Sequence, residues 1–296
     1  MGRGFESLLR HHSPQVKRSL STALLTALYL LMGGVAQLLR LVRWQRGPIE
    51  KHLDRCLPGL PPARRQQVIA GFYRTLGELA AEVLSEPFLD RETLLARMRF
   101  DNSDSIAAQL QQQRRALILS AHHANWEWLL LRCSITFEQP LTAVYKPIRT
   151  PWAERLALRL RQRFNCDMVP ARQIVPHLMQ RRGQVRLLAM LADQSPAASN
   201  EQQAWLEFFG QATSFHTGPG WIAAKFNFTP YFAAIRRERR GRYVVRFTEL
   251  APAGTRMEPE QVLRAYVAAL EAHVRQYPEE YFWAYNRWKR EKPLYG

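Results

Sequence analysis

Two histidines, an asparagine and a glutamate follow one another closely where a buried strand gives way to a helix. The apolar run 116–120 predicts the strand, and the amphipathic stretch after Asn125, a good N-cap residue, predicts the helix. A carboxylate that accepts a hydrogen bond from one imidazole nitrogen fixes the tautomer and leaves the other nitrogen basic. We therefore predict that Glu127, in the first helical turn, reaches back to one imidazole of the pair His122 and His123. Because no serine or cysteine nucleophile accompanies this dyad, it would deprotonate a hydroxyl of the substrate.

Two other interpretations of the histidine pair remain open. Metalloproteases carry H-E-x-x-H on one helix face, and the order and spacing here differ from that pattern. Zinc would also need a third ligand, and the sequence does not place His177 or His216 near the pair. We expect no metal and no other cofactor. The second interpretation is a structural pair beside a helix cap, and we assign that packing role to His123, outside the catalytic set.

Short apolar strands that alternate with helices predict the fold class. Further strands are expected at 141–146 and 185–193, and a basic helix is expected at 152–164. The alternation is typical of an α/β fold with a largely parallel central sheet flanked by helices. Sites in such sheets lie beyond the carboxyl ends of the strands. Asp193 ends one strand as the histidine pair ends another, so we include Asp193 among the candidate site residues.

The second half of the chain completes the expected fold. We expect a loop that feeds a helix at 205–226, a hairpin at 231–250 that turns near Gly241, and a long helix at 258–278. The aromatic and basic stretch 281–290 suits either a membrane interface or a tail docked on the core by its tryptophans.

A helix at 60–84 carries Arg74, Glu78 and Glu82 on rows four residues apart. That spacing is typical of acids and bases that pair along one helix face. We therefore predict that these acids form a paired helix face and no functional site.

The N-terminal segment has the length and composition of a membrane anchor. Residues 19–39 carry no charge, and basic residues flank them on both sides. As a helix they would be about 31 Å long, roughly one hydrocarbon core. No small-x-small cleavage site of a signal peptide follows. We predict a membrane anchor at 1–45 and one catalytic domain at 46–296, and the basic flanks leave open whether the helix spans the bilayer or lies in one leaflet.

The chain is strongly basic. It has 42 Lys and Arg against 25 Asp and Glu, a formal net charge of +17, and most of its cations are arginine. Arginine binds phosphate through a bidentate fork, which suits nucleic acid or phosphorylated lipid. With an anchor present, the charge favours an anionic membrane surface, and we expect no nucleic-acid partner. The widely spaced Cys56, Cys133 and Cys166 form no C-x-x-C pair and fit a reducing compartment.

Five blocks of sequence occur in a characteristic order. They are H-x4-E at His122–Glu127, "VYKPIRTPWAERLALRLRQRFN" with R-x-R at Arg161 and Arg163, "LADQ", "EFFGQATSFHTGPGWIAAK" and "YPEEYFWAYNRWK". Together with the N-terminal anchor they resemble the bacterial lipid A late acyltransferases, the lauroyl/myristoyl branch of the lysophospholipid acyltransferase superfamily. One H-x4-E motif is weak, whereas five blocks in order are strong.

The chain departs from the family pattern at three positions. The family more often has an aromatic residue and then glycine after the first histidine, where this chain has His123 and Ala124. After R-x-R-x the family often has glycine, where this chain has Asn165. None of these departures removes the dyad, and each could line the acceptor or acyl pocket.

The resemblance implies a membrane-associated O-acyltransferase of lipid A and lipopolysaccharide biosynthesis. Such enzymes move a fatty acyl group from acyl carrier protein, or sometimes coenzyme A, to a hydroxyl of a lipid A precursor. They act at the bacterial inner membrane with the catalytic domain on the cytoplasmic side. Acyl carrier protein is acidic, so a basic surface would speed its encounter with the enzyme.

The resemblance also implies roles for the site residues. His122 would be the general base on the acceptor hydroxyl, and Glu127 would orient it and stabilise its cation. The remaining candidates are substrate-binding residues, with the arginines holding an acceptor phosphate or sugar acid: Arg161, Arg163, Asp193 and Asn125.

Two alternatives to this function remain. The protein could acylate another lipid, such as a glycerolipid, an ornithine lipid or a glycosyl lipid. It could instead be a non-catalytic lipid-binding protein on the same fold, although such a protein would have no need to keep both His122 and Glu127.

Overall fold

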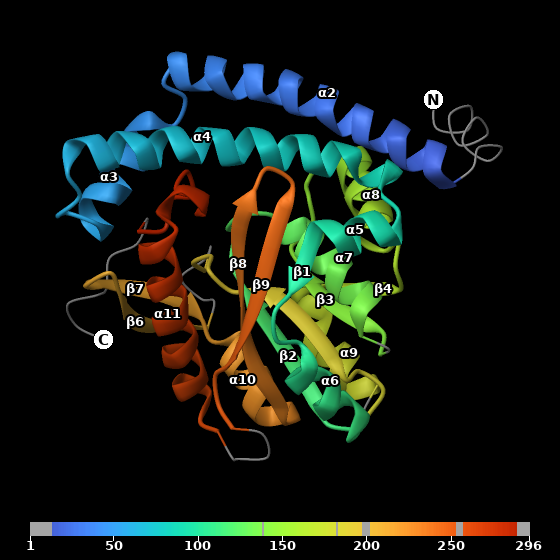
Figure 1. The fold of residues 1–296 in the computed structure, drawn as a ribbon. Coiled ribbons are helices and arrows are strands. Elements are labelled where there is room, and N and C mark those ends of the chain that lie inside the picture. Colours follow the sequence, from blue (N-terminus) through green and yellow to red (C-terminus); the bar gives the residue numbers. More distant parts are fainter. Residues whose placement is uncertain (1–13, 138, 182, 197–201, 253–256, 289–296) are drawn as a thin grey trace.

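The computed structural model describes residues 14–288 apart from 138, 182, 197–201 and 253–256 (Figure 1). Its centre is a seven-stranded sheet in the order β1-β9-β8-β2-β5-β3-β4. All neighbouring strands are parallel except the antiparallel pair β8–β9. The strands of this sheet are β1 (Met98–Phe100), β2 (Arg115–Ser120), β3 (Leu141–Tyr145), β4 (Cys166–Pro170), β5 (Leu187–Leu191), β8 (Phe228–Arg239) and β9 (Arg242–Glu249). The predicted α/β fold with a largely parallel sheet is confirmed.

Helices precede, connect and follow these strands. The α-helices are α2 (Pro14–Leu41), α3 (Arg46–Cys56), α4 (Pro62–Ser85), α5 (Arg91–Arg97), α6 (Asp104–Gln111), α7 (Trp126–Thr136), α8 (Pro151–Arg161), α9 (Ile174–Gln180), α10 (Gly218–Phe226) and α11 (Pro259–Gln276). Three short 3-10 helices are η1 (Glu86–Phe88), η2 (Ala171–Gln173) and η3 (Pro278–Glu280).

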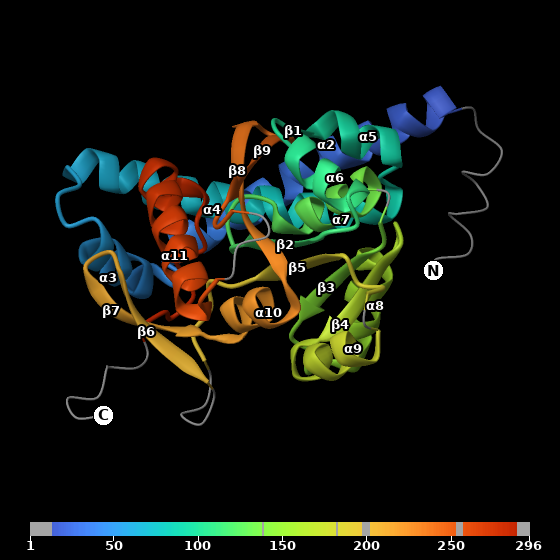
Figure 2. The ribbon, with the colours of Figure 1, turned by 90° about the horizontal axis from the view of Figure 1, so that it is seen from below.

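Both faces of the sheet are covered, and its central strand, β2, is apolar from Ala116 to Leu119. Along β2, Leu117 and Leu119 pack into one core cluster and Ala116 and Ile118 into the other. Helices α10 and α11 contribute to the first cluster, and α5, α6 and α7 to the second (Figures 1 and 2). A strand that is buried on both sides loses the alternation of apolar and polar residues, which explains the continuous apolar run before the histidines.

The register between β2 and β5 determines which residues meet beyond the sheet. Ser120 is paired with Leu191 at the carboxyl ends of these adjacent parallel strands. The pairing continues one step further, because the Ala192 amide donates to the Ser120 carbonyl at 3.0 Å. His122, two residues after Ser120, and Asp193, the residue after Ala192, are therefore brought to the same edge.

The apolar helix α2 lies along α4, and the pair crosses the end of the sheet where β8 and β9 turn (Figure 1). On its inner side Leu25 and Ala36 are buried, at 3% and 4% exposed. Gly77 of α4 permits this close approach, since a Cβ there would lie 2.8 Å from the Ala36 Cβ. On its outer side large apolar residues are exposed. Residues 1–13, part of the predicted anchor segment, lie outside the described residues.

One expected element was wrong. Where we expected a loop, β6 (Gln203–Phe208) and β7 (Gln211–His216) form an antiparallel hairpin that leads into α10. Phe209 and Gly210 make its two-residue turn with φ of 55° and 70°. Positive φ at both positions matches the right-handed twist of the strands, as in a type I′ turn. An aromatic-glycine pair that turns a hairpin resembles a loop when only composition is considered.

Candidate active site

Asp193 holds His122 through both of its carboxylate oxygens. The Nδ1 atom of His122 is 2.7 Å from Asp193 Oδ1, and the His122 backbone amide donates to Oδ2 at 3.1 Å. Asp193 itself is only 3% exposed, whereas the His122 side chain is 21% exposed. The carboxylate therefore holds the imidazole at Nδ1, and the rest of the partly exposed ring remains accessible to a substrate.

The electrostatics of this pair define which imidazole nitrogen is basic. Burial opposes the charge of Asp193, but His122 outweighs it through its charge and hydrogen bonds, so the pKa of Asp193 is lowered. An ionised carboxylate accepts a hydrogen bond from the N–H at Nδ1, so the proton stays on Nδ1 and the lone pair is on Nε2. The Gln194 amide nitrogen lies 3.4 Å from Nε2. Burial likewise opposes the imidazolium, but the charge and hydrogen bond of Asp193 raise the pKa of His122 above 6.5.

Glu127 lies beside this pair but does not make the predicted hydrogen bond to the imidazole. Arg161 of α8 occupies both of its oxygens, with Nε donating to Oε2 at 2.8 Å and Nη2 donating to Oε1 at 2.5 Å. The indole N–H of Trp126 also donates to Oε1, at 3.2 Å. A bidentate arginine competes well for a carboxylate, so Glu127 is turned toward α8. Its negative charge still contributes to raising the pKa of His122.

The second arginine of R-x-R has a different position from the first. Arg163 donates to the backbone carbonyls of Glu86 and Leu89, the latter at 2.9 Å. These bonds tie the segment after α8 to η1 and to the residue that follows it. Arg161 thus joins the group around His122, while Arg163 holds the segment after α8 in place. The binding of an acceptor phosphate by the two arginines stays a prediction.

Asn125 is the N-cap of α7, as predicted. Its Oδ1 accepts the Trp128 amide at 2.8 Å, and its Nδ2 donates to Glu82 Oε2 at 2.5 Å. Asn125 is 0% exposed. A direct contact with substrate would have to break one of these bonds, so the geometry favours a positioning role for Asn125 over the expected substrate contact.

The C-terminal segment clamps the histidine loop. The Phe282 amide donates to the His122 carbonyl at 3.0 Å, and the Ala124 amide donates to the Glu280 carbonyl at 2.8 Å. Trp283 is 1% exposed and donates to the Pro278 carbonyl, so this stretch is docked on the core rather than presented to a membrane. The last residues of the stretch, 289–290, lie outside the described residues.

His123 packs inside the protein, as predicted. It is 1% exposed, its Nε2 is 2.5 Å from the Ile235 carbonyl, and its ring lies against His273. Burial lowers the pKa of His123 well below its usual value, which keeps the ring neutral. It therefore takes no part in the proton chemistry of its neighbour.

Comparison with known proteins agrees with this arrangement. Residues 24–290 match the family described as bacterial lipid A biosynthesis acyltransferase. The chain belongs to this family. A lipid A biosynthesis acyltransferase of Haemophilus influenzae is 28% identical over 248 residues, which cover 81% of this chain and 74% of that protein. Family membership supports an enzyme that transfers acyl groups to a lipid.

Two departures from the family's glycines fall at left-handed backbone positions. Ala124, in the histidine loop, has φ of 49°, and Asn165, after α8, has φ of 62°. Glycine adopts such angles without steric cost, and asparagine tolerates them better than most residues. Both positions therefore have a backbone conformation that glycine adopts readily, although this chain carries a side chain at each.

Arg287 is a functional candidate that the sequence did not single out. It is 3% exposed, donates to the Asp193 carbonyl and to the Ser214 carbonyl, and stacks 3.9 Å from the Phe215 ring centroid. Its charge helps to lower the pKa of Asp193. The only sequence signal was its place in the R-W-K ending, whose Lys289 lies outside the described residues.

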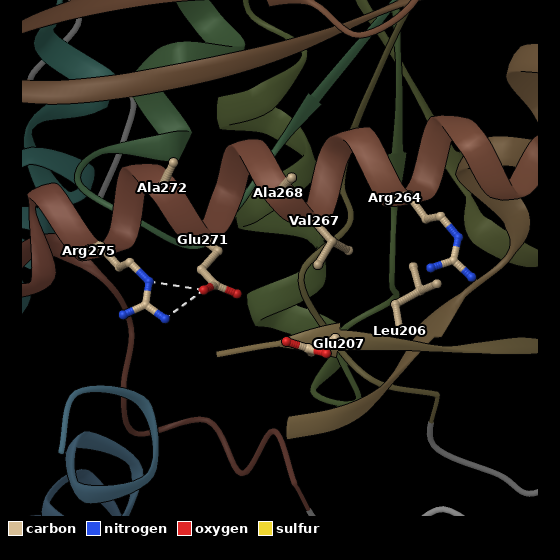
Figure 3. A pocket seen from close by; sticks show the side chains of 8 residues that line it. All are labelled: Leu206, Glu207, Arg264, Val267, Ala268, Glu271, Ala272 and Arg275. Carbon is tan, nitrogen blue, oxygen red and sulfur yellow. Dashed lines mark hydrogen bonds and ion pairs between the residues drawn. The ribbon is translucent and has the colours of Figure 1, made fainter. Parts of the chain in front are cut away.

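One groove of the described residues lies away from this group. It holds about 400 Å³ between α11 and β6, and Figure 3 shows Leu206 and Val267 on its walls and the Glu271–Arg275 pair at one end. None of its lining residues belongs to the group around His122. It therefore lacks the imidazole and the carboxylate that the β2 and β5 ends bring together, and we place the candidate active site at those ends. The described residues contain no cluster of three or more metal-ligating side chains.

Proposed function

We propose that the protein moves a fatty acyl group from acyl carrier protein, or coenzyme A, to a hydroxyl of a lipid A precursor. The observation that carries the proposal is the His122–Asp193 pair at the ends of two adjacent parallel strands. It presents a basic Nε2 on a partly exposed ring, in a chain of an acyltransferase family. This differs from the predicted dyad in that Asp193, not Glu127, is the group that orients the imidazole.

The proposed reaction has two steps. The acceptor hydroxyl donates its proton to His122 Nε2 as its oxygen attacks the thioester carbonyl carbon. Asp193 stabilises the imidazolium that forms. The tetrahedral intermediate then collapses, the carbon–sulfur bond breaks, and the thiolate takes the proton from Nε2. The base is thereby regenerated, and the products are an ester and a free thiol.

The groups beside His122 would bind the substrates. Arg161 is held by Glu127 next to the base and would face an anionic group of the acceptor. The Trp126 ring lies edge-on, 5.1 Å from the His122 ring, and would exclude water from the thioester. Exposed cations of α8, among them Arg155 and Arg159, would attract an acidic carrier protein.

Transfer of a labelled acyl group tests the proposal. The protein is incubated in phospholipid vesicles with labelled acyl-acyl carrier protein and a lipid A precursor that carries a free hydroxyl. We expect a labelled glycolipid, with acyl-coenzyme A and a glycerolipid acceptor as parallel arms. Transfer to the glycerolipid alone would favour the other lipid substrates, and lipid binding without any transfer would favour the non-catalytic alternative.

We further propose that α2 attaches the protein to the inner membrane while it stays docked on α4, with the catalytic site on the cytoplasmic side. Ser19–Leu41 is long and apolar enough to cross a membrane by length and composition. However, its partner helix carries charged residues such as Arg65 and Arg74, so the pair cannot enter the hydrocarbon together. A docked α2 would instead insert only its outer face into the cytoplasmic leaflet.

Replacing outer-face leucines should weaken membrane binding without unfolding the protein. Leu31 and Leu38 are 60% and 58% exposed, so Leu31→Glu with Leu38→Glu leaves the contact with α4 intact. Each leucine lost from lipid should lower the affinity for anionic vesicles by about tenfold. Met179→Glu, at a residue that is 61% exposed on α9, is the matched control. If the double variant stays on vesicles in high salt, the membrane contact lies elsewhere.

A further inference from the structure

Glu82 of α4 is a buried carboxylate on which three segments converge. It is 0% exposed and accepts hydrogen bonds from Tyr29 at 2.6 Å, Asn125 at 2.5 Å and Tyr243 at 2.8 Å. These donors come from α2, from the N-cap of α7, and from β9. The apolar N-terminal helix and the catalytic loop thus share one acceptor.

The predicted pairing of acids and bases along α4 was wrong for this residue. Its neighbour one turn earlier, Glu78, does find cations, but they are Arg237 and Arg240 of the β8–β9 hairpin rather than residues of its own helix. Glu82 accepts its hydrogen bonds from two hydroxyls and an amide. A carboxylate surrounded by neutral donors is costly to bury for stability alone, which points to a positioning task.

The hydrogen bond from Asn125 to Glu82 fixes the orientation of the Asn125 amide, and with it the start of α7 next to His122 (the catalytic loop, residues 121–127). Because Asn125 Nδ2 donates to Glu82, its Oδ1 must face the Trp128 amide and cap α7. A rotated amide would set its own N–H₂ group against that donor. The capped turn carries Trp126, whose ring lies against His122, and Glu127, which holds Arg161.

The bond from Tyr29 makes the same carboxylate sensitive to α2. Tyr29 reaches Glu82 from the face of α2 that lies on α4, next to the contact of Ala36 with Gly77. If α2 separates from α4, Glu82 loses the hydrogen bond from Tyr29 and keeps those from Asn125 and Tyr243. The apolar helix that meets the membrane is therefore two hydrogen bonds away from the N-cap of the catalytic helix.

We propose that Glu82 is a positioning residue through which the docking of α2 on α4 sets the geometry of the catalytic loop. In this arrangement turnover depends on α2 being seated, so the enzyme works best when its membrane helix is in place. The catalytic consequence rests on the proposed function, whereas the structural link between Tyr29 and the α7 cap does not.

The protonation state of Glu82 links its hydrogen bonds to one another, so that loss of the bond from Tyr29 weakens the bond from Asn125. Burial raises the pKa of Glu82 to about 7, and the hydrogen bonds from its three donors oppose this. Loss of the Tyr29 hydroxyl removes one opposing bond, so the pKa of Glu82 rises further and a larger share of the carboxyl is protonated at neutral pH. A protonated carboxyl accepts less strongly from Asn125. The ionisable groups that act on Glu82 are Tyr29, Tyr243, Glu78 and Glu86, and Arg97 acts on Tyr29.

Tyr29→Phe tests the link with a matched control. Tyr73→Phe also removes one hydroxyl between α4 and the α2 region, since Tyr73 donates to the Trp44 carbonyl at 2.6 Å, but it leaves Glu82 untouched. We expect Tyr29→Phe to lower kcat about tenfold at pH 7 with KM for the acyl donor unchanged, because a hydrogen bond to a charged group is lost. Relative to the unmodified enzyme at each pH, the defect should deepen at pH 6.5 and shrink at pH 8.5.

Two further measurements keep the proposal falsifiable. Glu82→Gln removes the titrating group, so its defect relative to the unmodified enzyme should shrink at pH 6.5, where the unmodified carboxyl is itself largely protonated, and deepen at pH 8.5, the reverse of Tyr29→Phe. Hydrogen exchange of the Trp128 amide reports the α7 cap without any assay of activity, and it should accelerate in Tyr29→Phe but not in Tyr73→Phe. Equal exchange in the two variants overturns the link itself. Faster exchange with an unchanged kcat overturns its catalytic role, and loss of transfer in the unmodified protein would instead refute the proposed function.

Discussion

His122→Ala is expected to lower kcat by a hundredfold or more, on the order expected for loss of a general base. The partly exposed ring packs against Trp126 but does not fill the core, so the variant should fold. Acyl transfer from a labelled thioester in vesicles measures the loss, and thermal unfolding checks the fold. The KM for the acyl donor should change little, because the imidazole acts on the acceptor hydroxyl.

A second histidine provides the control for this experiment. His177 of α9 lies near Asp167, 3.5 Å away, in a pair that resembles His122–Asp193 in composition but not at a strand end of the site. His177→Ala should leave transfer unchanged. Near-normal turnover by His122→Ala would refute the proposed mechanism, and equal losses in the two variants would indicate a structural effect.

The sequence predicted the local structure of the site well. The strand before the histidines, the N-cap at Asn125 and the helix that carries Glu127 all appear as expected. These features depend on burial patterns and capping within about fifteen neighbouring residues, which a single sequence displays directly. The helices α4, α8 and α11 and the β8–β9 hairpin were likewise predicted within a few residues.

The partner of the base was not predicted, for a reason that lies in topology. Asp193 is 71 residues from His122, and the two meet only because β5 lies between β2 and β3 in the sheet. Strand order depends on packing over the whole domain, so a local pattern favours the carboxylate that is near in sequence. Glu127 was the nearer choice, and Arg161 of α8, also distant in sequence, turns it away.

Burial of polar groups was the second source of error. Glu82 has the spacing of a paired helix face, yet α2 covers that face and leaves it 0% exposed. Arg287 lies in a C-terminal stretch that is rich in basic and aromatic residues, yet its side chain is buried and donates to the Asp193 carbonyl. Glu82 was assigned to a paired helix face and Arg287 was not singled out, because charged residues are rarely buried; those that are buried concentrate where a site must be positioned.

The choice between Asp193 and Glu127 as the group that orients the base can be decided by two isosteric variants. Asp193→Asn replaces an acceptor of two hydrogen bonds, from Nδ1–H and from the backbone amide of His122, with a group that has only one accepting atom. The amide would meet one of these donors with its own N–H₂ group and favour the wrong tautomer. We expect kcat to fall on the order of a thousandfold, as in other catalytic pairs that lose their orienting carboxylate.

The pH dependence of the residual activity should distinguish a lost charge from a general distortion. Because Asp193 raises the pKa of His122, its neutralisation should move the acid limb of kcat/KM to lower pH. Glu127→Gln keeps one acceptor for Arg161 and leaves the His122–Asp193 pair intact, so we expect a loss of about tenfold with only a small shift of the acid limb in the same direction. The opposite ranking of the two variants would mean that Glu127 takes over the imidazole when substrate binds and that Arg161 then releases it to hold the acceptor.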